Sequence, residues 1–255
     1  MSGHQYDENM SEQLPLPITN RVICSTRAEA RAFLATRMTM RELHAGDVLY
    51  EECQPFDHAI FPHRGVISLL ARMEDGRTVE KASIGNEGFL GFTYLRGGRG
   101  AIGLTVVQID GYASFLRMSD LDEAMETFTC VRYAMLLYSK ALISQLMELV
   151  ACNGLHSATQ RVARWLLHAD DRMNGSDFPL TQEALSQVLG LRRATVSASC
   201  SQLSKNGAIR YSRGMISVSD RTRLRSFSCE CYDRITARSY PITPDFSPAT
   251  RNDDD

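Results

Sequence analysis

Residues 180–218 have the sequence LTQEALSQVLGLRRATVSASCSQLSKNGAIRYSRGMISV, which predicts a helix, a tight turn, a second helix and a small hairpin. Thr181 fits the N-cap of the first helix, because its hydroxyl can accept a hydrogen bond from the following turn. Gly190 permits the positive φ that ends this helix. The second helix carries apolar residues at i, i+4 and i+7, which are Val196, Cys200 and Leu203. Two short alternating runs around Arg213-Gly214 complete the unit as a hairpin.

A helix, a short glycine turn and a second helix form the unit that places its second helix in the major groove of DNA. The face opposite Val196 is small or basic, contains no acid, and begins with the pair Arg192-Arg193. Small side chains let the backbone approach DNA closely, and guanidinium groups bind guanine edges or phosphates. An ordinary surface helical hairpin shares the caps and the apolar stripe, but it does not explain this face. The predicted DNA contacts are Arg192, Arg193, Ala194, Thr195, Ser197, Ala198, Ser201 and Lys205 on the second helix, Thr181 and Gln182 at the start of the first, and Arg210 and Arg213 on the hairpin.

The segment resembles the winged helix-turn-helix of the Crp/Fnr family of bacterial transcription regulators. The matching positions are Thr181-Gln182-Glu183, Leu189-Gly190, Arg193, Thr195-Val196-Ser197, Leu203, Gly207 and Ile209. A weaker resemblance extends upstream to about residue 45. It implies an α+β fold with an N-terminal antiparallel β-roll (a cyclic-nucleotide-binding-like jelly roll), a long dimerisation helix and a C-terminal winged helix-turn-helix. It also implies a homodimer, an inverted-repeat operator in double-stranded DNA and contact with RNA polymerase.

The formal net charge of −2 over 255 residues hides an asymmetry. Residues 155–228 contain 11 Lys and Arg against 5 Asp and Glu, whereas the remainder is acidic. A basic part on an acidic remainder fits a nucleic-acid-binding module joined to another domain. The seven scattered cysteines indicate reduced thiols. There is no apolar signal region at the N-terminus and no uninterrupted apolar run of roughly 20 residues, so we expect a cytoplasmic protein without a membrane segment.

Between residues 43 and 118, short runs rich in β-branched and aromatic residues predict an antiparallel barrel or sandwich. Within the family resemblance, residues 85–91 (GNEGFLG) match the turn that leads to the ligand pocket. Cyclic-nucleotide-binding members continue with a Glu for the ribose and, farther on, an Arg-Ser/Thr-Ala triplet for the phosphate. Here Phe92 follows, and no such triplet occurs before Gly111. A buried phosphate without an arginine lacks its counter-charge, so cyclic AMP is not expected, and either another effector or none remains open.

Helical periodicity predicts helices over residues 27–40, 120–153, 155–173 and 220–232. The longest of these carries two adjacent apolar stripes, and both must be covered. One stripe can lie on the β-roll and the other against a second copy, although the central core helix of a monomer is an alternative. The stripe assigned to dimerisation consists of Met135, Leu142, Leu146 and Leu149. The neighbouring stripe consists of Leu136, Ile143, Met147 and Val150.

The predicted division is a disordered tail (1–20), the β-roll (21–119), the dimerisation helix (120–153), the winged helix-turn-helix domain (154–232) and a second tail (233–255). No P-loop, Gly-x-Ser-x-Gly, His-Glu-x-x-His or Cys-x-x-Cys motif is present, so we expect no enzyme activity, no cofactor and no metal. Cys229-Glu230-Cys231 could bind a metal or respond to oxidants, but no second Cys pair or His lies nearby in the sequence. The alternative function is a β-roll module for protein interaction or thiol redox sensing, with vestigial DNA contact.

Overall fold

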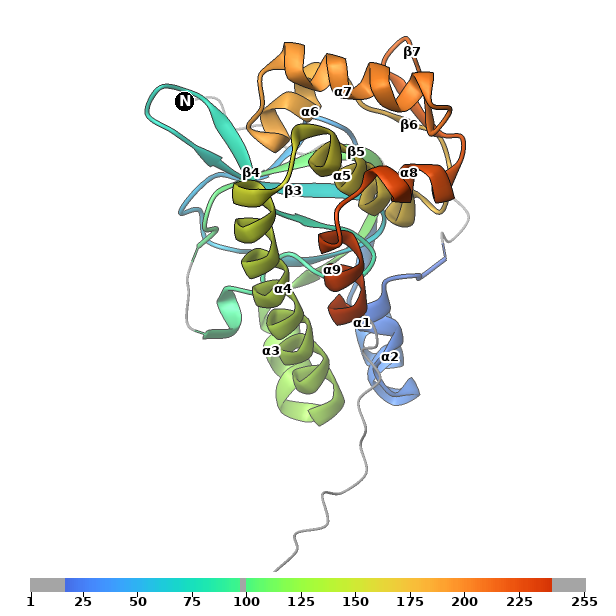
Figure 1. Ribbon diagram of the computed structural model, residues 1–255. Coiled ribbons are helices and arrows are strands. Elements are labelled where there is room, and N and C mark those ends of the chain that lie inside the picture. The colour runs from blue at the N-terminus through green and yellow to red at the C-terminus, as the bar shows by residue number, and fades with distance from the viewer. Residues whose placement is uncertain (1–16, 97–99, 240–255) are drawn as a thin grey trace, which may run out of the picture.

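Two long strands form the centre of an antiparallel sheet in the N-terminal half (Figure 1). β3 (His58–Arg72) pairs along most of β5 (Leu104–Arg117), in the order β1-β5-β3-β4 with β2 also paired to β5. The shorter strands are β1 (Thr39–Leu43), β2 (Val48–Tyr50) and β4 (Thr78–Ile84). The computed structural model describes residues 17–96 and 100–239. The predicted antiparallel sheet is therefore confirmed.

The long strands bend because their register shifts at several places. The shifts between β3 and β5 lie between Pro62 and Ile67, and an unmatched residue in one strand bends it and increases its twist. Gly65 has a φ of 97°, and a Cβ on it would lie 2.8 Å from the carbonyl oxygen of Ile109. The two backbones approach more closely here than a side chain permits, so the sheet curls around its own core.

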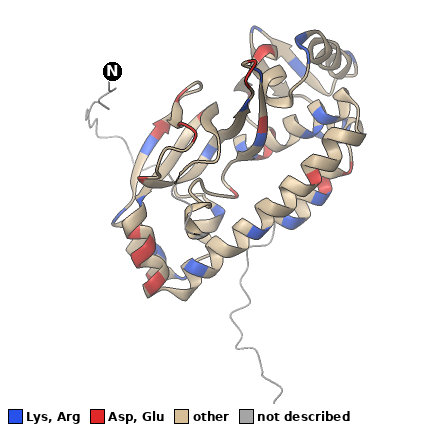
Figure 2. Ribbon diagram, turned by 90° about the vertical axis from the view of Figure 1, so that its left-hand side faces the viewer, with Lys and Arg blue, Asp and Glu red and all other residues tan. Residues whose placement is uncertain are grey.

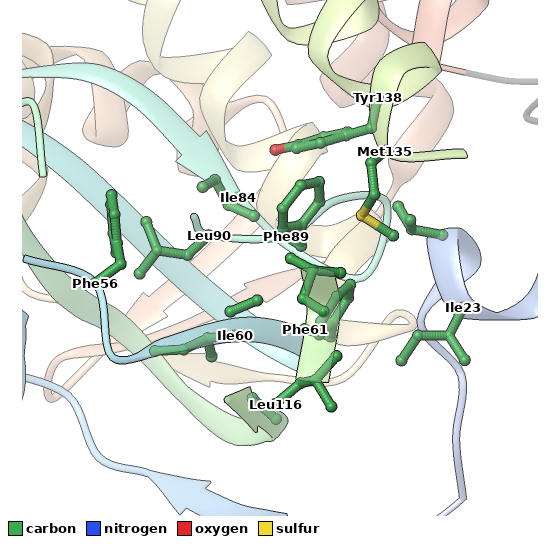
Figure 3. Packing of buried hydrophobic residues seen from close by; sticks show 14 of the residues in the cluster. Ile23, Phe56, Ile60, Phe61, Ile84, Phe89, Leu90, Leu116, Met135 and Tyr138 are labelled. Carbon is green, nitrogen blue, oxygen red and sulfur yellow. The ribbon is translucent and has the colours of Figure 1, made fainter. Parts of the chain in front are cut away.

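Aromatic and branched side chains fill the interior of the roll (Figure 3). Phe61 and Phe89 stack with their ring centroids 5.3 Å apart. Tyr138, from the long helix α4 (Thr129–Leu155), lies at the same centroid distance from Phe89, and Met135 lies beside it. The core therefore continues from the sheet into the helix that covers it.

The helices around the roll differ from the predicted ones at their ends. α2 (Ala28–Ala35) is shorter than predicted, because the chain from Thr39 onward pairs with β5. The helix predicted over residues 120–153 is two helices, α3 (Met118–Thr127) and α4. Phe128 separates them, because it is extended (φ −120°, ψ 104°) and its ring packs edge-on against Phe33. The remaining helices of this half are α1 (Arg21–Cys24) and the 3₁₀ turn η1 (Tyr94–Arg96).

Asn20 lies in the residues predicted as a disordered tail, yet its side chain is fully buried. Its Oδ1 accepts hydrogen bonds from the N–H groups of Val22 and Ile23 and so caps α1. Its Nδ2 donates to the carbonyls of Pro62 at 2.8 Å and Gly88 at 2.7 Å. The predicted tail is therefore wrong at its C-terminal end, because the two bonds from Nδ2 tie the chain to the roll and the two to Oδ1 fix the start of α1. Residues 1–16 lie outside the described part.

The two apolar stripes of α4 are exchanged relative to the prediction. Met135 and Leu142 are fully buried, and Leu146 packs against the same core. Leu149 is also buried. The dimerisation assignment of this stripe is wrong, because side chains that pack inside the subunit are not available to a second copy. The exposed stripe is the neighbouring one, with Leu136, Ile143, Met147 and Val150 at 41%, 60%, 69% and 75% exposure.

The C-terminal half is built on α5 (Ala158–Met173), which begins with a capping box of Ser157 and Gln160. The predicted helix-turn-helix and hairpin are present. Their elements are β6 (Phe178–Pro179), α6 (Gln182–Leu189), α7 (Arg193–Lys205), β7 (Ile209–Ser212) and β8 (Met215–Val218), and β6-β8-β7 form a three-stranded wing. Val66 and Ile109 of the roll belong to the same core as this half, so the two units share buried surface.

The end of the chain differs from its prediction. The helix predicted over residues 220–232 is divided into α8 (Arg221–Phe227) and α9 (Cys231–Ser239). α9 continues into the residues predicted as a tail, because it packs along α4, buries Ile235 and forms an ion pair of 2.6 Å between Arg238 and Glu148. Residues 240–255, which the tail prediction also includes, lie outside the described part.

Buried polar contacts join α5 to the roll. The Arg172 guanidinium donates to both carboxylate oxygens of Glu87, at 2.6 and 3.2 Å, and to the hydroxyl and carbonyl of Ser83. Trp165 Nε1 donates to Glu80 at 3.1 Å, and burial raises the pKa of that carboxyl. A Cβ on Gly85 would overlap the Arg172 side chain. These contacts fix how the C-terminal half sits on the roll.

α4 is long and apolar enough to cross a membrane by length and composition alone. The expectation of no membrane segment overlooks this helix, because Lys140 and Ser144 interrupt its apolar run. In the structure the helix packs against the roll on one side and against α9 on another. Its apolar content is therefore that of a core helix with one exposed stripe.

Replacing Arg172 by Met should lower the free energy of unfolding by about 3–5 kcal/mol, because Glu87 keeps the hydrogen bond from the Gly85 N–H but is left buried without its counter-charge. The double variant Arg172→Met/Glu87→Leu should recover most of this loss. Denaturant unfolding measures both, with Arg77→Met, which breaks the exposed Arg77–Asp75 pair, as the control that changes little. An Arg172→Met protein as stable as the control would show that the buried pair does not hold the two halves together.

Candidate nucleic-acid interface

The turn between α6 and α7 is fixed by local hydrogen bonds. Thr181 Oγ1 accepts from the N–H of Ala184 at 3.1 Å and caps α6. Gly190 has a φ of 60°, and the Leu191 N–H returns to the carbonyl of Ser186 at 3.0 Å. This is the pattern in which a left-handed residue satisfies the last carbonyls of a helix, and it sends α7 off at a sharp angle.

α7 has one buried face. Val196 and Leu203 are fully buried beneath it, with Cys200 between them, and the helix packs on α5. Thr159 Oγ1 of α5 donates to Gln202 Oε1 at 3.1 Å and shares a hydrogen bond of 3.2 Å with the Ser199 hydroxyl, which fixes the rotation of α7 about its axis. The opposite face therefore has to point to solvent, and α7 lies at the outer edge of the molecule (Figure 1).

The predicted DNA contacts lie on this outer side in two groups. The exposed ones are Thr181, Arg192, Arg193, Ala194, Ala198, Ser201, Lys205, Arg210 and Arg213. The half-buried ones are Gln182, Thr195 and Ser197. The structure thus brings the predicted contacts of α6, α7 and the wing onto one unit, called here the winged unit, and leaves most of their side chains accessible.

The charged side chains among these predicted contacts are all basic and exposed to solvent. Arg193 lies 3.9 Å from Glu183, but both side chains are more than half exposed, so solvent screens the pair and a phosphate can replace it. Arg213 sits at the tip of the wing with a φ of 50°, a left-handed conformation. Figure 2 shows acidic positions gathered on α3, which lies at the other end of the molecule from α7 (Figure 1).

A groove of about 1330 Å³ lies between the winged unit and the roll. It is lined by α6 and the start of α7, including Arg192 and Arg193, and on the roll side by residues 73 and 75–79 at the turn between β3 and β4. The basic end of α7 therefore faces this groove as well as solvent.

Side chains from elsewhere in the chain pack closely against residues 85–91, the turn that matches the one leading to the ligand pocket in cyclic-nucleotide-binding proteins. A Cβ on Gly88 would overlap the ring of Tyr138, and Glu87 is engaged by Arg172. Phe92 packs against the apolar core of the roll. The interior near this turn is thus filled by side chains from α4 and α5 as well as from the sheet.

The structure brings together four residues that sequence reasoning did not connect. Cys152 and His156 at the end of α4 meet Cys229 and Cys231 at the start of α9, with all ligand atoms within 4.8 Å of one another. A hydrogen bond from the Cys229 thiol lowers the pKa of Cys152. The prediction of no metal considered only Cys229 and Cys231, and the spacing Cys152-x₃-His156 was the signal that could have completed the set.

Residues 160–227 match the sequence family of the Crp-like helix-turn-helix domain. FixK2 from Bradyrhizobium japonicum has a similar structure, with a TM-score of 0.64, 22% identity, and coverage of 75% of this chain and 98% of that one. The c-di-GMP-responsive regulator CLP from Xanthomonas campestris has a TM-score of 0.61 at 13% identity, covering 76% and 100%. A CRP-family transcriptional regulator from Thermus thermophilus has a TM-score of 0.61 at 14% identity, covering 74% and 96%. Comparison with curated protein sequences gave no match.

The protein therefore joins an antiparallel roll to a Crp-like helix-turn-helix domain. The Crp-like helix-turn-helix and the similarity of the fold to solved Crp/Fnr-type regulators agree with the resemblance seen in residues 180–218.

Proposed function

We propose that this protein is a homodimeric, sequence-specific transcription regulator whose roll does not bind a cyclic nucleotide. The observation that carries the proposal is the outer face of α7, which is small, free of acids and led by Arg192 and Arg193. The buried face of the same helix is fixed on α5, so this outer face is presented rigidly. A rigid helix with such a face is suited to the major groove.

Arg193 at the start of α7 is suited to grip guanine O6 and N7 together, and Ala194 and Ala198 offer methyl contacts for thymine. Thr195, Lys205 and the hairpin residues Arg210 and Arg213 are placed to reach phosphates. Thr181 serves as the N-cap of α6, and its hydroxyl proton is still free to be donated to a phosphate.

The exposed stripe of α4 supports the dimer. Ile143, Met147 and Val150 are all at least 60% exposed and follow one another along one face. Such a row of large apolar side chains on a long helix favours a second copy of the same helix. Two helix-turn-helix units related by a two-fold axis then read an inverted repeat whose half-site centres lie about 10–10.5 base pairs apart.

The filled roll interior supports the absence of a cyclic nucleotide. A nucleotide at residues 85–91 would have to displace Tyr138 or break the Arg172–Glu87 pair, and this is unfavourable for an anionic ligand with no other arginine in the turn. We further propose a cytoplasmic protein without enzyme activity that acts through RNA polymerase. The alternative function is a roll that binds other proteins and keeps only vestigial DNA contact. Titrating the protein against genomic fragments distinguishes the two functions, because only a sequence-specific regulator binds some fragments more tightly than others.

Arg193→Ala should cost about 1–3 kcal/mol of binding to the operator and relax the preference at one base pair in each half-site. Arg213→Asn keeps a residue that tolerates the left-handed conformation, and it should weaken all sequences alike and reduce the salt slope by about one unit. Fluorescence anisotropy on operator and random duplexes measures both, with Arg132→Ala on α4 as control. An equal loss of affinity for both duplexes in Arg193→Ala would rule out base reading by this residue.

Ile143→Glu and Met147→Glu should each give monomers that lose operator affinity, since a carboxylate would be buried at the centre of the helix pair. Ala28→Glu adds the same charge at the exposed start of α2 and should leave the mass unchanged. Sedimentation velocity measures the mass of all three. Unchanged mass in both α4 variants would remove this stripe from the dimer interface.

Cyclic AMP and cyclic GMP at millimolar concentration should shift neither the melting temperature nor the DNA affinity. A ligand that binds only the folded state must stabilise it by mass action, so thermal shift is a sensitive measurement. A dose-dependent rise in melting temperature with either nucleotide would contradict the proposal for the roll.

A further inference from the structure

Three buried thiols and one imidazole meet where the end of α4 touches the start of α9. Cys152, Cys229 and Cys231 are at most 4% exposed, and together they form a small buried cluster separate from the two apolar cores. His156 completes it, and its Nδ1 lies 3.6 Å from Cys231 Sγ. The Sγ atoms of Cys152 and Cys229 lie 3.5 Å apart.

These separations are those of ligands around one small ion. Zinc–sulfur bonds of about 2.3 Å in a tetrahedron place two sulfur ligands about 3.8 Å apart. All four ligand atoms lie within 4.8 Å of one another, which encloses room for one ion and not for several irons with their sulfides. Three thiolates and one imidazole in a closed tetrahedral site form a donor set typical of structural zinc.

The histidine is oriented as a metal ligand. Its Nε2 lies 3.2 Å from the carboxylate of Glu230, while Nδ1 faces the cysteines. A carboxylate that accepts the Nε2 proton leaves the Nδ1 lone pair free, which is how outer-shell acids commonly support zinc-binding imidazoles. Glu230 lies between the two cysteines in sequence, so one short loop supplies two thiols and the supporting acid.

The surroundings also suit the charge of such a site. Three thiolates, a neutral imidazole and a divalent ion carry one negative charge. Arg164 is only 5% exposed and acts electrostatically on Cys152, and its Nε has no hydrogen-bond partner among the described residues. The half-buried Arg161 lies in the field of Cys152 and Cys229. Arg164 also acts on the buried Glu80, and Arg161 donates to the Leu189 carbonyl, so a negatively charged site adds a further partner to two arginines already placed here.

We propose that Cys152, His156, Cys229 and Cys231 bind one Zn²⁺ ion that joins the end of α4 to α9. Binding replaces the thiol protons by the metal and releases them to solvent. The site is independent of the DNA-binding proposal, since none of its residues lies on α7 or the wing. A Cys152–Cys229 disulfide is the competing use of the cluster, and it would leave Cys231 and His156 without a function.

The full-length protein, purified with reductant and without chelator, should contain one zinc per chain by plasma mass spectrometry. Cys231→Ser should lose it, whereas Cys200→Ser, which removes a buried thiol outside the cluster, should retain it. Glu230→Gln, at an exposed carboxylate, should fold normally and bind zinc about 10-fold more weakly. Cobalt substituted for zinc should give the visible absorption of a tetrahedral site with thiolate ligands.

Thiol titration of the wild-type protein tests the same site without mutation. In denaturant with chelator and no reductant, all seven cysteines should react. Five reactive thiols would reveal a disulfide and overturn the proposal. So would a metal-free protein whose melting temperature does not rise when one equivalent of zinc is added under reducing conditions, because a ligand of the folded state must stabilise it.

Discussion

The buried pair between Arg172 and Glu87 is the contact on which the relation of the two halves depends. It places a charged helix residue inside a turn of the roll, and Gly85 leaves the space that the Arg172 side chain occupies. Buried ion pairs add little to stability when compared with a well-packed apolar contact, but they are intolerant of displacement. A slip of α5 by one turn would leave two unpaired charges in the interior. The position of α6 and α7 on the molecule therefore follows from one pair of side chains.

The winged unit could be predicted from sequence because its signals are local. Thr181, Gly190 and the Val196 stripe each act within a few residues of their own position. The stripes of α4 could not be ranked in this way, because both have the same period and only the position of the roll decides which is buried. Met135 is covered because Phe61 and Phe89 stand beneath it. The break at Phe128 and the burial of Asn20 depend on partners far away in the chain, so no local sequence pattern predicts them.

The cluster of cysteines and histidine is a second case in which contacts between residues distant in the chain could not be predicted from local sequence. Cys229 and Cys231 are visible as a pair, but Cys152 lies 77 residues from Cys229 in the chain, and their contact depends on α9 folding back along α4. For the roll, the absence of cyclic-nucleotide binding stays a prediction, because it rests on Phe92 and the missing Arg-Ser/Thr-Ala triplet in the sequence. In the structure the interior beside residues 85–91 contains the rings of Phe61, Phe89 and Tyr138, and each buried phenylalanine contributes about 1.5–3 kcal/mol. A ligand would have to open this core before it could occupy it.

The turn at residues 85–88 is held from three sides. Asn20 donates to Gly88, Tyr138 covers the same glycine, and Arg172 binds Glu87. These partners are separated by tens of residues in the chain, so their loops must close before the contacts form. The helix-turn-helix, by contrast, is assembled from neighbours. We expect the C-terminal half to acquire its structure early and the turn to be completed last, which would make the roll the slow and aggregation-exposed part of the folding reaction.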